Sequence, residues 1–166
     1  IMEMYQEYGW RKFIIVVPSV AIREGVIKTL NQTSKHFDKL YDKPSYNFYE
    51  YDSDNLQQVR NFARSNEIEI MVMTLQSFNK GEDNLMFQQQ DSLQGDRPVD
   101  FIQKSNPALI LDEPQNMESE NSKEALSQLN PLFKLRYSAT HRDTYNLLYQ
   151  LGPYEAYRKG LVKQID

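Results

Sequence analysis

The stretch ALILDEPQ, residues 108–115, decides the fold class of this chain. Four consecutive apolar residues are typical of a strand that is buried on both faces of a parallel sheet. Asp112 and Glu113 then follow at the carboxyl end of that strand, which is the sheet edge where α/β folds bind ligands. Adjacent acids in this position cost stability unless they are solvated or paired with a cation. The alternative is a plain acidic turn in which Pro114 ends the strand.

The composition limits the class of protein. A length of 166 residues suits one domain, and 40% hydrophobic with 25% charged residues is ordinary for a globular chain. Because there is no cysteine and there are two histidines, we expect no disulfide framework and no thiolate zinc site. The apolar runs are far shorter than the roughly 20 residues of a membrane helix, and no signal-peptide pattern is present, so no membrane partner is expected. A net charge of −4 argues against a uniformly basic nucleic-acid coat but leaves local basic clusters open.

Strand and helix patterns alternate along the chain. Runs of β-branched and aromatic residues predict the strands, and apolar residues at helical spacing predict the helices. Parallel strands need crossovers of a dozen or more residues, so this spacing predicts an α/β fold with a largely parallel sheet. The predicted strands span 13–17, 46–51, 68–74, 108–111 and 132–137; the predicted helices span 1–9, 20–37, about 56–63 after an acidic cap at 52–54, 98–104, 119–129 and parts of the tail.

One segment breaks this alternation. Residues 81–97 are rich in Gln, Asp and Gly and have little periodicity, so we expect an exposed, mobile loop with at most a short helix near Leu85. No linker divides the chain, and residues 1–166 are expected to be one partial domain. The sequence starts at Ile1 within a segment of helical composition, which suggests a fragment of a longer protein.

The acidic pair suits phosphoryl transfer. Such a site needs a carboxylate that holds Mg²⁺ and a second group that orients the attacking water. Asp112 is the candidate for the metal and Glu113 for the water. Ser138 and Thr140 come at the end of another predicted strand, where their hydroxyls could hydrogen-bond the acidic pair; helix capping is the alternative.

Two more sets of polar residues follow predicted strands. Pro18 ends the first strand and Ser19 is a good cap for the next helix, with Arg23 one turn further on. Helix N-termini bind anions, so a DNA phosphate is a candidate ligand here; a solvated helix face is the alternative. The second set, after the strand 68–74, is Thr74, Gln76 and Ser77.

Four spans resemble the ordered motifs of a superfamily 2 helicase core. They are VPSVAIREGV (17–26), MTLQSF (73–78), LDEPQ (111–115) and LRYSATHRD (135–143). A lone Asp-Glu pair would be weak evidence, whereas four motifs in the family order are specific. The chain looks like the restriction (Res) subunit of type III restriction-modification enzymes, and the likeness covers most of the chain from about Trp10, including the tail LGPYEAYRKGLVKQI (151–165).

The resemblance implies a fold and a function. The fold would be a RecA-like, P-loop NTPase type three-layer sandwich, here as part of the first RecA-like domain of an ATP-driven DNA translocase that serves DNA cleavage. ATP and Mg²⁺ would be the cofactors of the parent protein. Double-stranded DNA and a modification methyltransferase subunit would be its partners, in the prokaryotic cytoplasm.

The resemblance also implies roles for single residues. Asp112 and Glu113 would serve ATP hydrolysis, and Gln115 would touch the same site from the strand edge. Ser138 and Thr140 would couple this site to movement of the motor. The DNA backbone would contact Pro18, Ser19, Arg23, Thr74, Gln76 and Ser77.

The phosphate-binding loop of such a site is missing from the sequence. No GxxxxGK[ST] occurs, because none of the six glycines is followed by Lys. That loop supplies the backbone amides and the Lys that cradle the phosphates, and in the family it lies just upstream of the first helix. We therefore expect the isolated chain to lack appreciable ATPase, translocase or nuclease activity.

Three other classes remain for comparison. An ABC-type ATPase also has an apolar strand ending in Asp-Glu-Pro, but its LSGGQ-like signature is replaced here by FIQKSNP (101–107). A superfamily 2 translocase of repair or remodelling would differ from a restriction enzyme by lacking a nuclease. A non-catalytic DNA-binding or interaction module would use the acidic pair only structurally.

Overall fold

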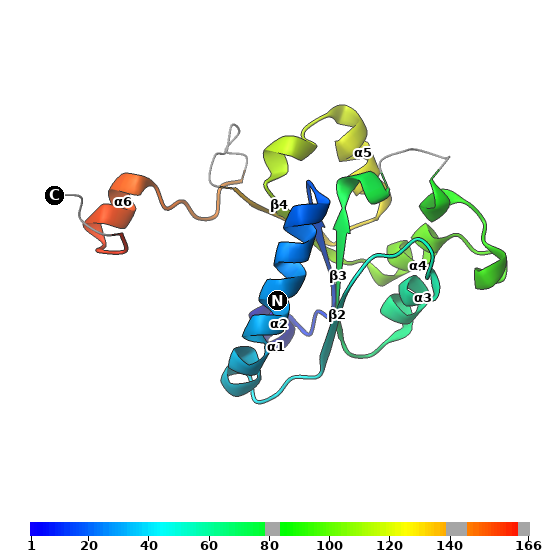
Figure 1. The fold of residues 1–166 in the computed structure, drawn as a ribbon, viewed down its shortest axis with the longest axis horizontal. Helices are drawn as coiled ribbons and strands as arrows, with labels where there is room; N and C mark the ends of the chain where they lie inside the picture. The colour runs from blue at the N-terminus through cyan, green and yellow to red at the C-terminus, as the bar shows by residue number, and fades with distance from the viewer. Residues whose placement is uncertain (79–83, 139–145, 163–166) are drawn as a thin grey trace.

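One parallel sheet organises the molecule, as the sequence predicts. The computed structural model describes residues 1–78, 84–138 and 146–162 (Figure 1). Its strands lie in the order β2-β3-β1-β4-β5, and all neighbouring pairs are parallel. The elements are α1 Met2–Tyr8, β1 Lys12–Val17, α2 Val20–Leu40, β2 Tyr46–Glu50, α3 Gln57–Arg64, β3 Ile68–Thr74, η1 Leu75–Ser77, η3 Leu85–Phe87, η4 Asp91–Leu93, α4 Pro98–Ser105, β4 Ala108–Asp112, η5 Pro114–Met117, α5 Glu120–Gln128, β5 Phe133–Tyr137 and α6 Pro153–Arg158.

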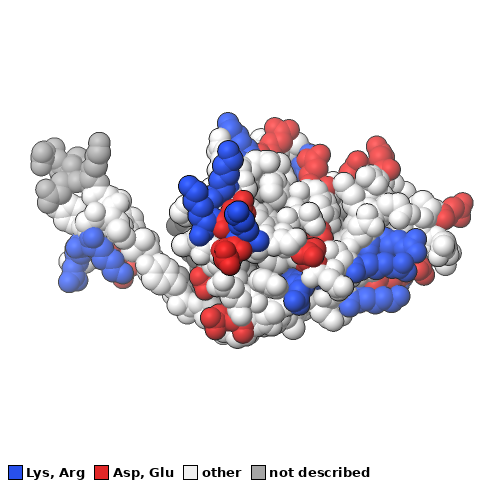
Figure 2. Space-filling view, turned by 90° about the horizontal axis from the view of Figure 1, so that it is seen from below, with Lys and Arg blue, Asp and Glu red and all other residues white. Residues whose placement is uncertain are grey.

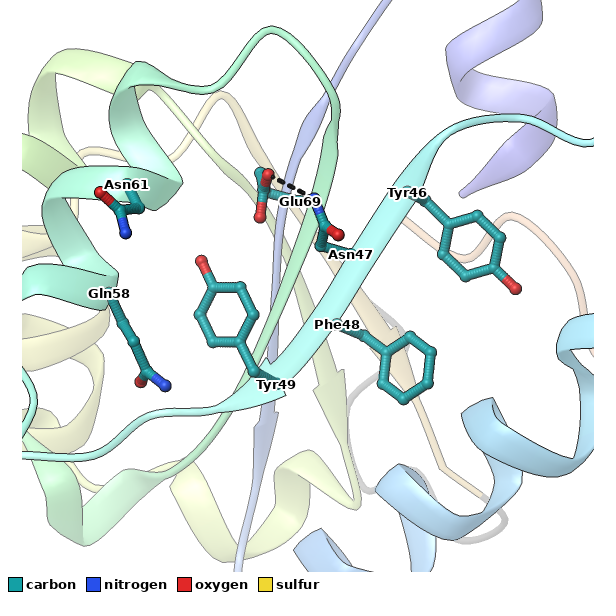
Figure 3. A pocket seen from close by; sticks show the side chains of 7 residues that line it. All are labelled: Tyr46, Asn47, Phe48, Tyr49, Gln58, Asn61 and Glu69. Atoms are coloured by element: carbon teal, nitrogen blue, oxygen red, sulfur yellow. Dashed lines mark hydrogen bonds between the residues drawn. The ribbon is translucent and has the colours of Figure 1, made fainter.

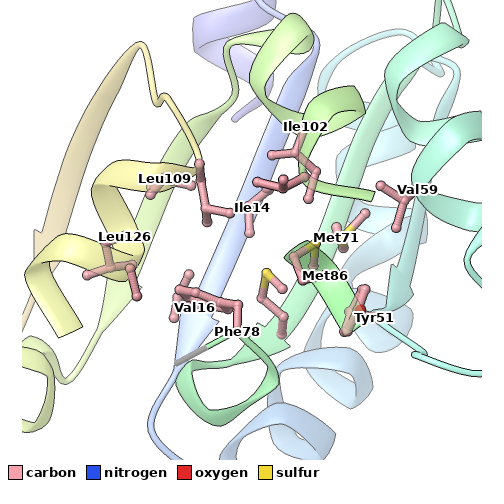
Figure 4. Packing of buried hydrophobic residues seen from close by; sticks show 14 of the residues in the cluster. Ile14, Val16, Tyr51, Val59, Met71, Phe78, Met86, Ile102, Leu109 and Leu126 are labelled. Carbon is pink, nitrogen blue, oxygen red and sulfur yellow. The ribbon is translucent and has the colours of Figure 1, made fainter. Parts of the chain in front are cut away.

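Helices cover both faces of the sheet. Alternate residues of β1 enter different cores. Ile14 and Val16 pack with α3, α4 and α5 (Figure 4). Phe13 and Ile15 pack with α1 and α2 on the other face. This alternation follows from the two-residue period of a strand. Because both faces of β1 are covered, its five residues from Phe13 to Val17 are all buried. The arrangement is the three-layer α/β sandwich that the sequence predicts.

Local signals set the ends of several helices where predicted. Gly9 ends α1 in the left-handed conformation with φ 70°, which a glycine adopts without strain. Ser19 caps α2, and Ser119 caps α5. The predicted acidic cap of α3 is wrong. Asp52 instead accepts a hydrogen bond from the backbone of Asp54 in a turn, and α3 begins at Gln57.

The described part of segment 81–97 is mostly exposed, as expected, but two buried apolar residues anchor it to the core. This part, 84–97, contains the short turns η3 and η4, of which η3 lies at the predicted position near Leu85. Met86 is fully buried and Leu93 is 1% exposed, and both belong to the core beside α3 and α4. Isolated apolar residues in a polar segment give no periodic signal, so the sequence did not reveal these anchors. The mobility of the segment stays a prediction.

The C-terminal part of the described chain leaves the sheet. Residues 146–152 and α6 lie apart from the sandwich, and Tyr154 of α6 is 71% exposed (Figure 1). Thr140, one of the predicted site residues, lies outside the described residues. Over the described ranges no helix is both long enough and apolar enough to cross a membrane.

Candidate functional site

The parallel sheet brings most of the predicted site residues to one edge. The register pairs Val17 of β1 with Thr74 of β3, and Asp112 of β4 with Tyr137 of β5. Residues that follow these strands therefore share the carboxyl edge of the sheet, where α/β folds bind ligands. Two neighbourhoods result, one at the ends of β4 and β5 and one at the ends of β1 and β3.

The acidic pair occupies the end of β4, and Glu113 adopts a left-handed backbone conformation there. Burial, and then the negative charge of Glu113, raise the pKa of the half-buried Asp112 carboxyl above its ordinary value. Glu113 has φ 52° and ψ 55°, a left-handed conformation that costs a residue other than glycine about 1–2 kcal/mol. A backbone hydrogen bond of 3.0 Å from Glu113 N to the Tyr137 carbonyl oxygen ties this turn to β5. Strain of this kind concentrates at functional sites.

Gln115 connects the acidic pair to the end of β5. Its Nε2 donates a hydrogen bond to Oε2 of Glu113. Its Oε1 accepts a hydrogen bond of 2.9 Å from the Ser138 hydroxyl. The amide therefore joins two residues that the sequence predicted to communicate, since it donates with one end and accepts with the other.

An ion pair that the sequence analysis missed supports this connection. Arg136 Nη2 of β5 lies 2.7 Å from Oε1 of Glu118, which follows η5. Both side chains are about one third exposed. Their positions, 18 residues apart on two different segments, carry no local signal, so only the pairing of β4 with β5 could have revealed the contact.

The ends of β1 and β3 present a different set of groups. Ser19 Oγ accepts a hydrogen bond of 3.4 Å from Ile22 N, so Ser19 is engaged as the cap of α2. The hydroxyls of Thr74 and Ser77 lie 3.0 Å apart and bond each other, and Thr74 is buried. Gln76 between them is exposed. A ligand at this edge would meet Gln76 before it met the two hydroxyls.

Arg23 is paired within the chain. Its Nε lies 3.1 Å from Oε2 of Glu50, at the end of β2, and its side chain is 18% exposed. The sequence predicted Arg23 as a phosphate contact or as part of a solvated helix face. The ion pair places a carboxylate against this guanidinium, so an anion that bound Arg23 would lie next to Glu50.

The described residues do not form a complete metal site on their own, and the face in Figure 2 carries no continuous basic surface. Among them no group of three or more His, Cys, Asp or Glu side chains is placed to hold a metal ion. Mg²⁺ is commonly bound by one or two carboxylates together with substrate phosphates, and the pair Asp112 and Glu113 suits that mode. On the face shown in Figure 2, Lys and Arg lie in separate groups with acidic residues between them, rather than in one continuous basic stripe.

Comparison with known proteins agrees with the resemblance. The family model described as "Type III restriction enzyme, res subunit" matches residues 1–143. The chain is 26% identical to the Res subunit of the type III restriction-modification enzyme EcoP15I of Escherichia coli, over 99% of this chain and 19% of the relative. It is 25% identical to the StyLTI Res subunit of Salmonella typhimurium, over 99% of this chain and 20% of the relative.

The matches cover nearly all of this chain but a small part of each relative. The chain spans about a fifth of the length of the curated relatives that it matches. The family model covers far more than half of the chain and includes β1 to β5. The chain therefore belongs to the Res subunit family of type III restriction enzymes, as a segment of its helicase-like region.

Proposed function

We propose that this chain forms part of the ATP-driven DNA motor of a type III restriction endonuclease. The hydrogen-bonded series Glu113, Gln115, Ser138 carries the proposal, because it joins the acidic end of β4 to the end of a second strand. The backbone hydrogen bond of Glu113 to Tyr137 and the side-chain hydrogen bond from Gln115 hold the Glu113 carboxylate in one position, as a water-orienting group requires. Family membership supports the same conclusion.

The acidic pair would divide the chemistry of ATP hydrolysis. Asp112, whose raised pKa reflects a partly desolvated carboxylate, would hold Mg²⁺ together with the ATP phosphates. Bound Mg²⁺ would neutralise the charge that develops on the phosphoryl oxygens. Glu113 would orient the attacking water, and Gln115 would fix the position of the Glu113 carboxylate.

The other neighbourhood of the sheet edge would contact DNA. Arg23, Gln76 and the start of α2 at Pro18 and Ser19 would meet the phosphate backbone, with Thr74 and Ser77 supporting the loop through their mutual hydrogen bond. Ser138 and Thr140 would couple the hydrolytic site to the rest of the motor. Because phosphate contacts carry no sequence information, target recognition would fall to a modification methyltransferase subunit, in the prokaryotic cytoplasm.

The test is DNA-stimulated ATP hydrolysis by a longer polypeptide that supplies a phosphate-binding loop upstream of Ile1. Glu113→Gln keeps the size of the side chain and removes its charge. We expect hydrolysis to fall by about 10² to 10⁴-fold while ATP binding is retained, because water activation is lost and the phosphate contacts are not. The control is Glu120→Gln, since Glu120 is an exposed acid in the first turn of α5.

The results of this experiment distinguish an ATP-driven motor from a non-catalytic interaction module. Unchanged hydrolysis in the Glu113→Gln variant would contradict the motor assignment and favour a non-catalytic interaction module. The 166-residue chain alone is expected to hydrolyse ATP at no measurable rate, since it contains no GxxxxGK[ST] loop. Steady hydrolysis by this chain that persists in Asp112→Ala would overturn the assignment of the site.

A further inference from the structure

A second polar site lies far from the acidic pair, between the edge strand β2 and α3. It is a pocket of about 490 Å³. The side chains that line it come from β2, α3 and β3 (Figure 3): Tyr46, Asn47, Phe48, Tyr49, Gln58, Asn61 and Glu69. Glu69 precedes the carboxyl end of β3 by five residues, or about 16 Å of strand, so the pocket is near the opposite end of the sheet from Asp112.

Glu69 is the unusual residue in this pocket. It is the one acidic residue of β3, where every residue is buried, and it is itself 4% exposed. Asn47, its register partner on β2, donates a hydrogen bond of 3.0 Å to Oε1 of Glu69. The Asn47 amide and the nearby Tyr49 hydroxyl leave part of the hydrogen-bonding capacity of the carboxylate unused. A buried charge is unfavourable unless it is compensated.

Lys12, the cation on the neighbouring strand β1, makes no ion pair with Glu69. Lys12 of β1 is the register partner of Glu69 on the other side, but its ammonium donates hydrogen bonds of 2.6 and 3.4 Å to the carbonyl oxygens of Ser65 and Glu67. Burial lowers the pKa of Lys12, and the Glu69 charge acts in the opposite direction. Lys12 is thus held at the turn before β3, and the lining of the pocket contains no Lys, Arg or His.

Two more polar groups at the pocket are enclosed by protein. Oε1 of Gln58 makes no hydrogen bond, and the Tyr49 hydroxyl interacts with the Glu69 carboxylate without a close hydrogen bond to any group. Figure 3 shows the Tyr49 ring directed between β2 and α3, with its hydroxyl toward Glu69 and Asn61. Burial, followed by the charge of Glu69, raises the pKa of Tyr49 well above its ordinary value, so the hydroxyl stays protonated. An enclosed polar group without a partner destabilises the fold, because it has lost its hydrogen bonds to water.

We propose that this pocket binds a guanidinium or alkylammonium group, with Glu69 as its counter-ion. The available groups are a carboxylate, an amide oxygen and a phenol, all of which accept hydrogen bonds, and the Tyr49 ring adds a surface that attracts cations. A cation that donates several hydrogen bonds would satisfy them together. The volume suits a ligand of the size of arginine. The source is either a free small molecule or a basic side chain of another protein.

The experiment titrates arginine amide into the ¹⁵N-labelled chain and follows the backbone amide signals of β2, α3 and β3 by NMR. We expect saturable shifts at Asn47, Tyr49 and Glu69. Glu69→Gln keeps the acceptor for Asn47 but removes the charge, and it should weaken binding by about tenfold or more. The matched control is Glu67→Gln, two residues away and exposed.

A neutral ligand, a second variant and a short peptide test the proposal further. Citrulline amide replaces the guanidinium with a neutral urea, and equal binding of both amides would overturn the proposal, as would equal affinity in Glu69→Gln or no binding at all. If Glu69→Gln proves unfolded in a thermal melt, Tyr49→Phe replaces it and should weaken binding several-fold. The peptide acetyl-Gly-Arg-Gly-amide identifies the source: tighter binding than arginine amide supports a protein side chain, and weaker binding supports a small molecule.

Discussion

The hydroxyl of Ser138, at the end of β5, donates a hydrogen bond of 2.9 Å to Oε1 of Gln115, in the turn that follows β4. The same amide donates from its other end to Glu113. A displacement of β5 relative to β4 would therefore move the amide and with it the Glu113 carboxylate. This connection links the end of β5 to the Glu113 carboxylate, in addition to the backbone hydrogen bond from Glu113 N to the Tyr137 carbonyl oxygen.

Removing this amide should disconnect the Ser138 hydroxyl from the Glu113 carboxylate. In the longer polypeptide, we expect Gln115→Ala to lower DNA-stimulated ATP hydrolysis by about 10²-fold, because a misplaced water-orienting group costs about that much. ATP binding should change little. Asn116→Ala, at the adjacent exposed position, is the control for an effect of the turn itself. Equal activity of Gln115→Ala and the unmodified protein in steady-state kinetics would show that the amide has no role in positioning.

The raised pKa of Asp112 predicts a stability that depends on pH. Because the folded state raises the pKa, it binds the proton more tightly than the unfolded state does, and stability is lost as the pH rises through the folded-state pKa. Asp112→Asn should therefore raise the melting temperature at pH 7 and leave it unchanged below the ordinary pKa of 3.8. Asp96→Asn, at an exposed position, should have no such effect. Destabilisation by Asp112→Asn at pH 7 would contradict this account.

The pair Arg23 and Glu50 predicts opposite effects on DNA affinity. Arg23→Gln should weaken binding of a double-stranded oligonucleotide and reduce the slope of log K against log salt by about 1, because one phosphate contact is lost. Glu50→Gln should strengthen binding, because it removes a carboxylate beside the bound phosphate. Lys28→Gln on the exposed side of α2 is the charge-matched control. Fluorescence anisotropy at several salt concentrations measures all three, and an Arg23→Gln effect no larger than that of Lys28→Gln would remove Arg23 from the interface.

The buried anchor in segment 84–97 predicts a loss of stability. Met86→Ala should lower the free energy of unfolding by about 2–5 kcal/mol, because the side chain is fully buried in the core beside α3 and α4. Leu85→Ala, one residue away, should cost less than about 1 kcal/mol because Leu85 is 41% exposed. Denaturant titration of both variants decides whether the segment is part of the cooperative fold. Equal and small losses would show that it is a detached loop.

The sequence by itself determined the sheet and the identity of the acidic end of β4. The consecutive apolar residues 13–17, 70–73 and 108–111 are typical of strands that are buried on both faces of a parallel sheet. Capping residues such as Ser19 and Ser119 set helix starts through local hydrogen bonds. These signals are short in range, so they can be read without knowing the fold.

Only the tertiary structure decided which polar groups meet. The bridge through Gln115, the ion pairs of Arg136 with Glu118 and of Arg23 with Glu50, and the contact of Asn47 with Glu69 all join separate segments. Each depends on strand order and register, which bring distant residues within a few ångströms. A periodic pattern states which face of an element is buried, but it does not state which neighbour covers that face.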